Sequence, residues 1–115
     1  GSALRTRIPA FATLELDRVR VVGRDAPETL HVLLGDEAVA GSDAFAALAE
    51  EHAAMIAAYR ARDWEDARQI LGSLTGKAPS FGLERAYALY SERIASLAAS
   101  PPGADWDEVF QATEK

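Results

Sequence analysis

Apolar and charged residues alternate along residues 13–22, which read Thr-Leu-Glu-Leu-Asp-Arg-Val-Arg-Val-Val. This period of two is typical of a half-buried β-strand, because successive side chains of a strand point to opposite faces of the sheet. Leu14 and Leu16 fall in one phase of the alternation, and Val19 and Val21 fall in the opposite phase. One extra residue would bring them onto the same face, so the pattern predicts a β-bulge around Asp17 and Arg18.

A chain reversal and a second strand are predicted next. Residues 23–28 contain Gly, Asp and Pro, which supply the backbone dihedral angles of turns. Residues 29–34 read Thr-Leu-His-Val-Leu-Leu, and we expect them to pair with residues 18–22 as an antiparallel hairpin. An isolated hairpin is at best marginally stable in water, so its apolar face needs a cover. Its free edge is also a candidate site for homodimer formation, because unpaired strand edges pair with other chains.

Beyond the hairpin the hydrophobic period becomes that of an α-helix, and three helices are expected. Ser42, Asp63 and Ser80 are their predicted N-caps, Gly76 is the predicted stop of the second, and the third ends before Pro101. The expected apolar faces are Phe45, Leu48, His52, Met55, Ile56 and Tyr59, then Trp64, Ala67, Ile70, Leu71 and Leu74, then Leu83, Ala86, Tyr87, Tyr90, Ile94 and Leu97. The predicted fold is therefore α+β, an N-terminal antiparallel β-hairpin followed by an antiparallel array of three helices and a short C-terminal tail.

Residues 48–79 resemble one tetratricopeptide unit. Ala67, Leu71 and Pro79 stand at the spacing where that repeat has a small residue, a large apolar residue and a closing proline. A single unit cannot bury its own outer face, so the third helix and the hairpin are expected to pack against it. A free-standing tetratricopeptide-like module that binds another protein is accordingly one interpretation of the chain.

The composition limits the remaining possibilities. The chain has 115 residues, 49% of them apolar, which favours one compact domain. Its formal net charge of −6 argues against a nucleic-acid partner, since phosphate binding requires clustered Lys and Arg. The sequence has no apolar run of about 18 residues, so no direct membrane contact is expected.

Four segments are predicted along the chain. Gly1 and Ser2 are typical of a remnant left by cleavage of an expression tag. Residues 3–35 form the hairpin unit, residues 36–42 a linker, and residues 43–115 the helical module with its C-terminal tail.

Two segments resemble class III nucleotide cyclases. The first is Leu-Asp-Arg-Val-Arg-Val-Val-Gly-Arg at 16–24, followed by Pro27 and Leu-His-Val-Leu-Leu-Gly at 30–35, which is similar to the final strands of the catalytic sheet in this family. The second is residues 101–115, from Pro-Pro-Gly-Ala-Asp-Trp-Asp to Thr-Glu-Lys, which is similar to the extreme C-terminus of bacterial cyclases with a CHASE-type sensor. The resemblance implies that the hairpin ends a catalytic domain and that the helices form an accessory module.

The resemblance also implies a function for the parent protein. An adenylate cyclase converts ATP to cyclic AMP and diphosphate, uses Mg²⁺ or Mn²⁺ and works as a dimer, and ATP rather than GTP is the expected substrate. The catalytic and metal-binding residues of the family have no counterpart in this chain, so the fragment itself is expected to be non-catalytic and without a cofactor. Its expected partner is the upstream catalytic domain, and its expected location is the cytoplasmic portion of an inner-membrane protein.

One phosphate contact of the family falls within the hairpin turn. The family has a Lys before the turn Gly that reaches the substrate triphosphate, but Val22 stands at this position here. Arg24, just beyond Gly23, is the candidate substitute, because a guanidinium binds phosphate oxygens well. An exposed turn arginine is more often simply solvated.

No other residues form an enzymatic motif. His31 and His52 are the only imidazoles and have no metal-spaced neighbours, so packing or surface roles are expected. The acidic residues Asp105, Asp107 and Glu108 could attract a divalent cation, but a short tail seldom provides the six or more convergent oxygens that such ions need.

The large aromatics are the candidate interaction residues. Aromatic residues at helical spacing are usually core, but they can also line a groove for a partner. The candidates are Trp64, Tyr87, Tyr90, Trp106 and Phe110. Trp106 and Phe110 are four residues apart, and we expect them to dock the tail onto the helical module as one helical turn.

Overall fold

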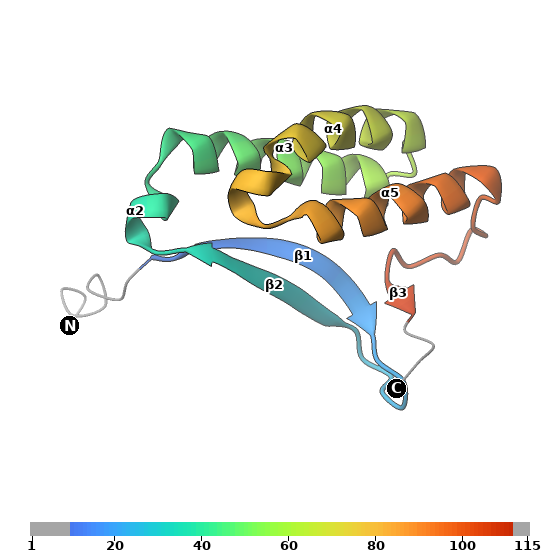
Figure 1. Ribbon diagram of the computed structural model, residues 1–115. Helices are drawn as coiled ribbons and strands as arrows, with labels where there is room; N and C mark the ends of the chain where they lie inside the picture. Colours follow the sequence, from blue (N-terminus) through green and yellow to red (C-terminus); the bar gives the residue numbers. More distant parts are fainter. Residues whose placement is uncertain (1–9, 112–115) are drawn as a thin grey trace.

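The computed structural model describes residues 10–111 and has an α+β fold (Figure 1). In chain order the elements are β1 (Ala12–Arg20), β2 (Glu28–Gly35), α2 (Glu37–Ala40), α3 (Asp43–Arg60), α4 (Trp64–Lys77), the 3₁₀ helix η1 (Ala78–Phe81), α5 (Glu84–Ala99) and β3 (Phe110–Gln111). The predicted hairpin and the array of three main helices are confirmed. The expected pairing of residues 18–22 with residues 29–34 is wrong, because residues 12–19 pair with β2 and residues 21–22 lie beyond the end of β1. The predicted tag remnant at residues 1–2 lies outside the described residues, as do the last four residues of the tail.

The sheet has the strand order β2-β1-β3. β1 and β2 form the antiparallel hairpin, and β3 runs parallel to the end of β1, with Val19 opposite Phe110 and Arg20 opposite Gln111. The helices lie along β1, while β2 is the strand farther from them (Figure 1). The third strand is not anticipated by the sequence, because it is a very short segment of the tail that pairs with the other end of the chain.

The predicted bulge is present in β1, one residue earlier than expected. Glu15 lies opposite His31 and Asp17 lies opposite Leu30, which leaves Leu16 without a residue opposite it on β2. The extra residue changes the phase of the alternation, as the sequence pattern requires.

The bulge carbonyls are hydrogen-bonded by the helices. His52 of α3 donates from Nε2 to the Glu15 carbonyl at 2.8 Å, and the Tyr90 hydroxyl of α5 donates to the Leu16 carbonyl at 2.6 Å. Because a carbonyl only accepts, His52 carries its proton on Nε2, and the Tyr87 hydroxyl donates to Nδ1 at 2.9 Å. Two backbone oxygens at the bulge thus accept hydrogen bonds from side chains of the helices.

Two of the three predicted N-caps are confirmed. The Ser42 side chain accepts a hydrogen bond from the amide of Phe45, and the Asp63 side chain accepts one from the amide of Asp66. The predicted linker between hairpin and helices contains the short helix α2, which Asp36 caps in the same way. These caps satisfy amides that have no partner within their helices.

The other two predicted boundaries are wrong. Gly76 does not stop the second helix, because α4 continues to Lys77 and η1 follows directly. Ser80 lies inside η1 rather than capping α5. Pro79 occupies the first turn of η1, and Gly82 adopts a left-handed backbone with φ of 68° that ends it. The Pro and Gly of this connection thus build a separate 3₁₀ turn, and α5 begins after it without a side-chain cap.

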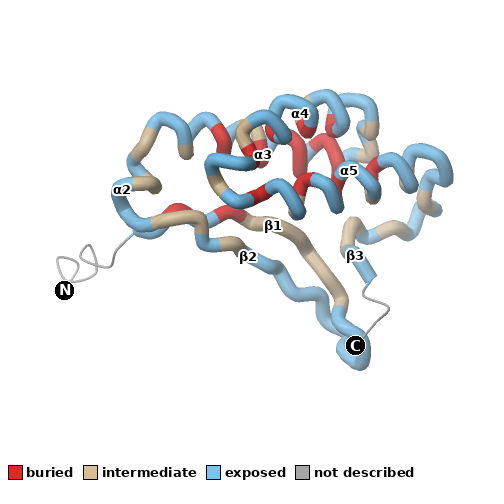
Figure 2. Tube along the Cα trace, in the orientation of Figure 1, coloured by how far each residue is buried: buried red, intermediate tan, exposed pale blue. Residues whose placement is uncertain are grey.

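A single hydrophobic core joins β1 to the helices (Figure 2). Leu14 is the buried residue that the hairpin contributes, and Val32 and Leu34 of β2 pack against the cluster as partly buried residues. The largest fully buried side chains are Leu48, Met55, Leu74, Leu83, Tyr87 and Ile94. The helices therefore provide the cover that the hairpin needs.

The side of the hairpin away from the helices carries an exposed leucine. Leu33, whose side chain alternates with those of the core-packed Val32 and Leu34, is 64% exposed. Leu30 shares the phase of Val32 and Leu34 but is still 42% exposed. Within the described part of the chain, β2 is paired with β1 alone. The outer edge of β2 is thus open to another strand.

We expect the stability of the protein to decrease as the pH falls through the ordinary histidine pKa of 6.5, because burial lowers the pKa of His52 below that value. The unfolded chain then binds a proton at a higher pH than the folded chain, so protonation favours unfolding until the pH is below the folded pKa. Urea denaturation at several pH values measures this loss. The His52→Gln variant, whose amide still donates to the Glu15 carbonyl, should show a flatter profile.

The exposed His31 provides the matched control. His31→Gln should retain the pH profile of the wild type. The hydrogen bond from Arg60 lowers the pKa of Glu15. This carboxylate therefore loses its stabilising effect only at pH values below the ordinary histidine pKa. A profile that is unchanged in His52→Gln would show that another group causes the acid sensitivity.

Candidate functional site

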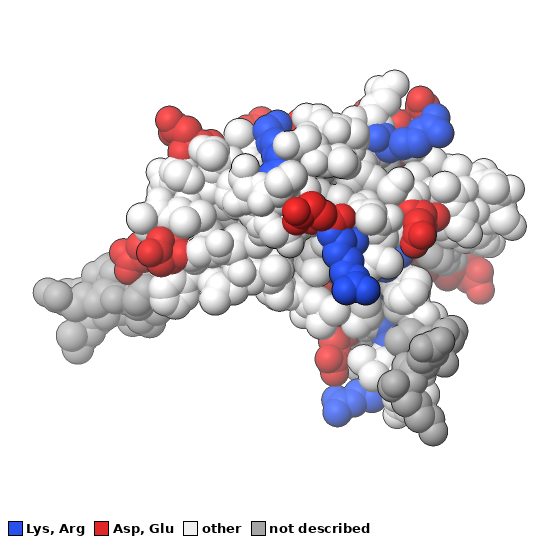
Figure 3. Space-filling view, in the orientation of Figure 1, with Lys and Arg blue, Asp and Glu red and all other residues white. Residues whose placement is uncertain are grey.

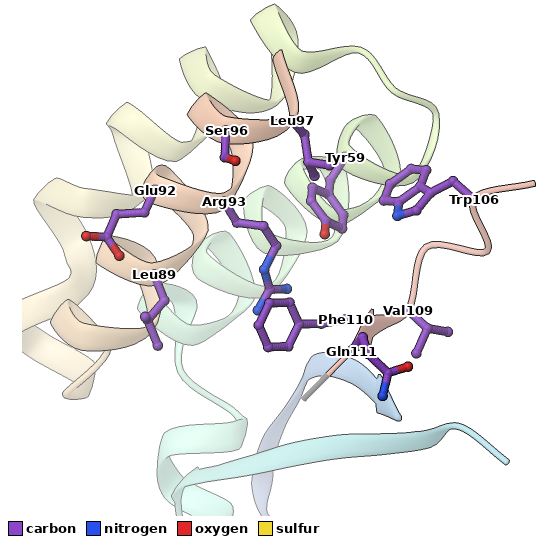
Figure 4. Close-up of a pocket in the computed structure, with 10 residues that line it drawn as sticks. All are labelled: Tyr59, Leu89, Glu92, Arg93, Ser96, Leu97, Trp106, Val109, Phe110 and Gln111. Carbon is purple, nitrogen blue, oxygen red and sulfur yellow. The ribbon is translucent and has the colours of Figure 1, made fainter. Parts of the chain in front are cut away.

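A groove of about 400 Å³ lies between helix α5 and the C-terminal tail (Figure 4). After α5 the tail turns back through the two prolines and ends as β3 beside β1 (Figure 1). The groove is lined by Tyr59, Leu89, Glu92, Arg93, Ser96, Leu97, Trp106, Val109, Phe110 and Gln111. Its walls thus come from α3, α5 and the tail.

Trp106 holds the tail in an aromatic cluster. Its ring contacts those of Tyr59 and Trp64, each with a centroid distance of 5.6 Å. Tyr59 also meets Tyr90 edge-on at 5.4 Å. Edge-to-face contacts of this kind stabilise a cluster beyond the burial of apolar area. Trp106 is therefore the apolar anchor of the tail.

Arg62 binds the tail beside this cluster. Its guanidinium lies 5.4 Å from the centre of the Trp106 ring, donates to the Pro102 carbonyl at 2.9 Å and also donates to the Gly103 carbonyl. Arg62 has a φ of 65°, in the turn between α3 and α4. Cation–π contact and hydrogen bonds to the backbone together position the start of the tail.

Arg93 connects α5 to both ends of the chain. It forms two hydrogen bonds of 3.0 Å with the Asp17 carboxylate, and its guanidinium lies 4.1 Å from the centre of the Phe110 ring. Figure 4 shows this ring lying against the guanidinium. Burial opposes the charge of Arg93, but the hydrogen bonds with Asp17 outweigh it and raise the pKa of Arg93. Because its charge is already paired, Arg93 positions the hairpin and the tail rather than offering a free site for an anion.

A weaker ion pair lies beyond the groove. Arg20 of β1 donates to the Asp107 carboxylate at 3.0 Å, and Asp107 also accepts from the amide of Val109. The hydrogen bond from Arg20 lowers the pKa of Asp107. The pair is exposed, so solvent screens it and its main effect is on the orientation of the tail.

Four of the five predicted interaction residues meet in this region. Trp64, Tyr90 and Trp106 belong to the aromatic cluster, and Phe110 lies across Arg93. Tyr87 does not join them, because it is 1% exposed in the core and bonded to His52. Burial raises the pKa of Tyr87 to about 12. Tyr87 therefore has a packing role.

The predicted helical turn of the tail is wrong. Trp106 is followed by irregular backbone and then by β3, and Glu108 adopts a left-handed conformation with φ of 67°. That conformation interrupts any right-handed helical run. Trp106 and Phe110 both dock on the helical module, as expected, but through separate contacts.

Arg24, the predicted phosphate contact, lies at the hairpin turn and does not line the groove. Its side chain is 69% exposed and pairs with Glu28 at 3.2 Å. The sequence analysis missed Arg62 and Arg93, which contact the tail directly. No local sequence signal marks them, because their partners in the tail and in β1 lie far away along the chain.

The described residues contain no group of three or more His, Cys, Asp or Glu that could hold a metal ion. Among residues 10–111, no helix is both long enough and apolar enough to cross a membrane. Comparison of the chain with protein-family models, with curated proteins and with solved structures finds no match. The groove and the hairpin edge are thus the features from which a function can be argued.

Proposed function

We propose that this chain is the C-terminal accessory module of a bacterial class III adenylate cyclase and is itself non-catalytic. In this proposal the hairpin is the last strand pair of the catalytic domain, and the helices brace it. The parent enzyme converts ATP to cyclic AMP, and its upstream domain binds the required Mg²⁺ or Mn²⁺. The module belongs to the cytoplasmic part of an inner-membrane protein.

The observation that carries the proposal is that the helices pack on one face of the hairpin only. On the face toward the helices Leu14 is buried and Val32 and Leu34 are partly buried, whereas Leu33 on the opposite face is 64% exposed and, within residues 10–111, the outer edge of β2 is open. A larger sheet would pair a strand with this edge, and its surroundings would cover Leu33. The resemblance of the hairpin sequence to the closing strands of cyclases supports the proposal that this larger sheet is the catalytic one.

The contacts between hairpin and helices support a bracing role. The ion pair of Asp17 and Arg93 and the hydrogen bonds of His52 and Tyr90 join β1 to α3 and α5. A hairpin fixed in this way has one orientation relative to the helices. Contacts made by the helices can therefore influence the catalytic domain and its pairing into a dimer.

The isolated chain is expected to form no cyclic AMP from ATP and Mn²⁺ and to give no heat of binding in a calorimetric titration. The metal-binding carboxylates of the cyclase reaction are absent from its sequence, so the metal-assisted step has no site. Arg24→Ala should behave like the wild type in this assay. Product formation by the isolated chain would contradict the proposal.

The positive test uses the protein with its upstream sequence. The coding region before residue 3 should encode a cyclase domain with paired metal-binding Asp residues, and the longer protein should be active. Removal of residues 43–115 from it should reduce its activity or its dimerisation. A start codon directly before residue 3 would overturn the assignment.

A tetratricopeptide-like interaction module is the second candidate, favoured by the groove beside α5. Leu89 and Phe110 border it and are 53% and 43% exposed. Apolar side chains in an open groove suit a peptide partner. Specific peptide binding by a chain with no upstream cyclase domain would favour this candidate.

A further inference from the structure

The C-terminal tail occupies a surface of the molecule that has the properties of a peptide-binding site. We define the tail site as the residues that contact the tail from outside it. They are Arg20, Tyr59, Arg62, Trp64 and Arg93, together with the end of strand β1. These residues come from β1, α3, the turn after α3, α4 and α5, so the site exists only in the folded chain.

Each contact of the tail site recognises a different feature of the tail. Tyr59, Trp64 and Arg62 enclose the Trp106 ring, and Arg20 binds the carboxylate of the next residue. Arg93 stacks on the ring of Phe110, four residues after the tryptophan. The edge of β1 pairs with the backbone in a parallel orientation. These are the elements of peptide recognition by strand addition, in which the backbone gives affinity and side-chain pockets give specificity.

The tail is only partly covered after its anchor. Phe110 is 43% exposed, the Asp107 side chain is 51% exposed and the pairing of β3 covers two residues. The connection from α5 to Trp106 is short and contains two prolines. A short connection gives the tail a high effective concentration, on the order of millimolar, so occupancy does not require tight contacts. A peptide from outside can then replace the tail when its own affinity is sufficient.

We propose that the tail site accepts an extended peptide from another chain and that the protein's own tail is a competing ligand. The peptide presents a Trp, an acidic residue directly after it and a Phe four residues after the Trp. It lies parallel to β1 and leaves the rest of the fold unchanged. This inference is independent of the cyclase assignment, because it depends only on contacts within residues 10–111.

The test compares two full-length chains with one peptide. The probe is a fluorescently labelled peptide of residues 101–111, and its binding is followed by anisotropy. In the Trp106→Ala chain the tail loses its anchor while the site stays intact. The peptide should bind this chain at least about tenfold more tightly than it binds the wild type, where the tail competes at high effective concentration.

Two controls identify the site. The same peptide with Ala in place of Trp106 should lose most of its affinity, and the double variant Arg62→Ala with Trp106→Ala should bind poorly. Equal affinity of the labelled peptide for the wild type and for Trp106→Ala would overturn the proposal. So would binding that does not depend on the tryptophan of the peptide.

A second variant covers the case in which Trp106→Ala fails to fold, as judged by circular dichroism. A flexible Gly-Ser extension of about 20 residues between Ser100 and Pro101 leaves every contact residue in place but lowers the effective concentration of the tail. The apparent affinity of the peptide for this chain should exceed that for the wild type. An unchanged affinity would again contradict the proposal.

Discussion

Asp17→Ala is expected to decrease the free energy of unfolding by about 3 kcal/mol, because it leaves the Arg93 charge largely removed from solvent and without its partner. The two side chains are only 14% and 15% exposed and form two hydrogen bonds of 3.0 Å. The cost of an unpaired charge at such a site exceeds what the ion pair contributes over an apolar pair. Urea denaturation followed by far-UV circular dichroism measures the change.

The double variant Asp17→Leu with Arg93→Met separates the cost of an unpaired charge from the contribution of the ion pair itself. It removes both charges, so its stability should lie well above that of Asp17→Ala. Glu28→Ala, which breaks the exposed ion pair of Glu28 with Arg24, is the surface control and should change the free energy by less than about 0.5 kcal/mol. If Asp17→Ala were as stable as this control, the ion pair would not be buried as described.

The second large effect is expected in the core. Leu48→Ala should decrease the free energy of unfolding by about 3 kcal/mol, since Leu48 of α3 is 0% exposed. The loss combines the burial of the deleted carbons with the cavity that remains among close-packed neighbours. The same denaturation measurement applies. Leu89→Ala is the matched control, because Leu89 is 53% exposed and its replacement should cost less than about 0.5 kcal/mol.

A small loss in Leu48→Ala would have a specific meaning. It would show that the helices can close the space, and hence that the core is less rigid than its burial suggests. Equal losses in Leu48→Ala and in its exposed control would contradict the placement of Leu48 in the buried core.

The sequence predicts those parts of the fold that depend on neighbouring residues. Alternation predicts the hairpin and its bulge, because the phase of a strand pattern decides which side chains reach the core. The caps Ser42 and Asp63 are predicted because a side-chain oxygen bonds an amide only three residues away. Ser80 has the same chemistry but lies next to Pro79, which starts a 3₁₀ turn in place of the expected helix.

The candidate site is predicted only in part. Its aromatic residues stand out in the sequence, but Asp17 and Arg93 are a long way apart in the chain, and charged residues at such a distance give no pairing signal. The same applies to β3, a two-residue strand that pairs with Val19 and Arg20. Short strands of this kind exist because the tertiary structure brings an edge near them, not because of their own propensity.

Leu16, the bulge residue of β1 that has no residue opposite it on β2, limits which insertions and deletions the strand can accept. Deleting Leu16 would shift Leu14 out of phase with the rest of the strand, so a polar neighbour would turn toward the core in its place. It would also displace the two carbonyls that His52 and Tyr90 bind. Homologous chains should consequently show a constant number of residues between Leu14 and Asp17, whereas insertions and deletions should be tolerated in the exposed turn at residues 21–27.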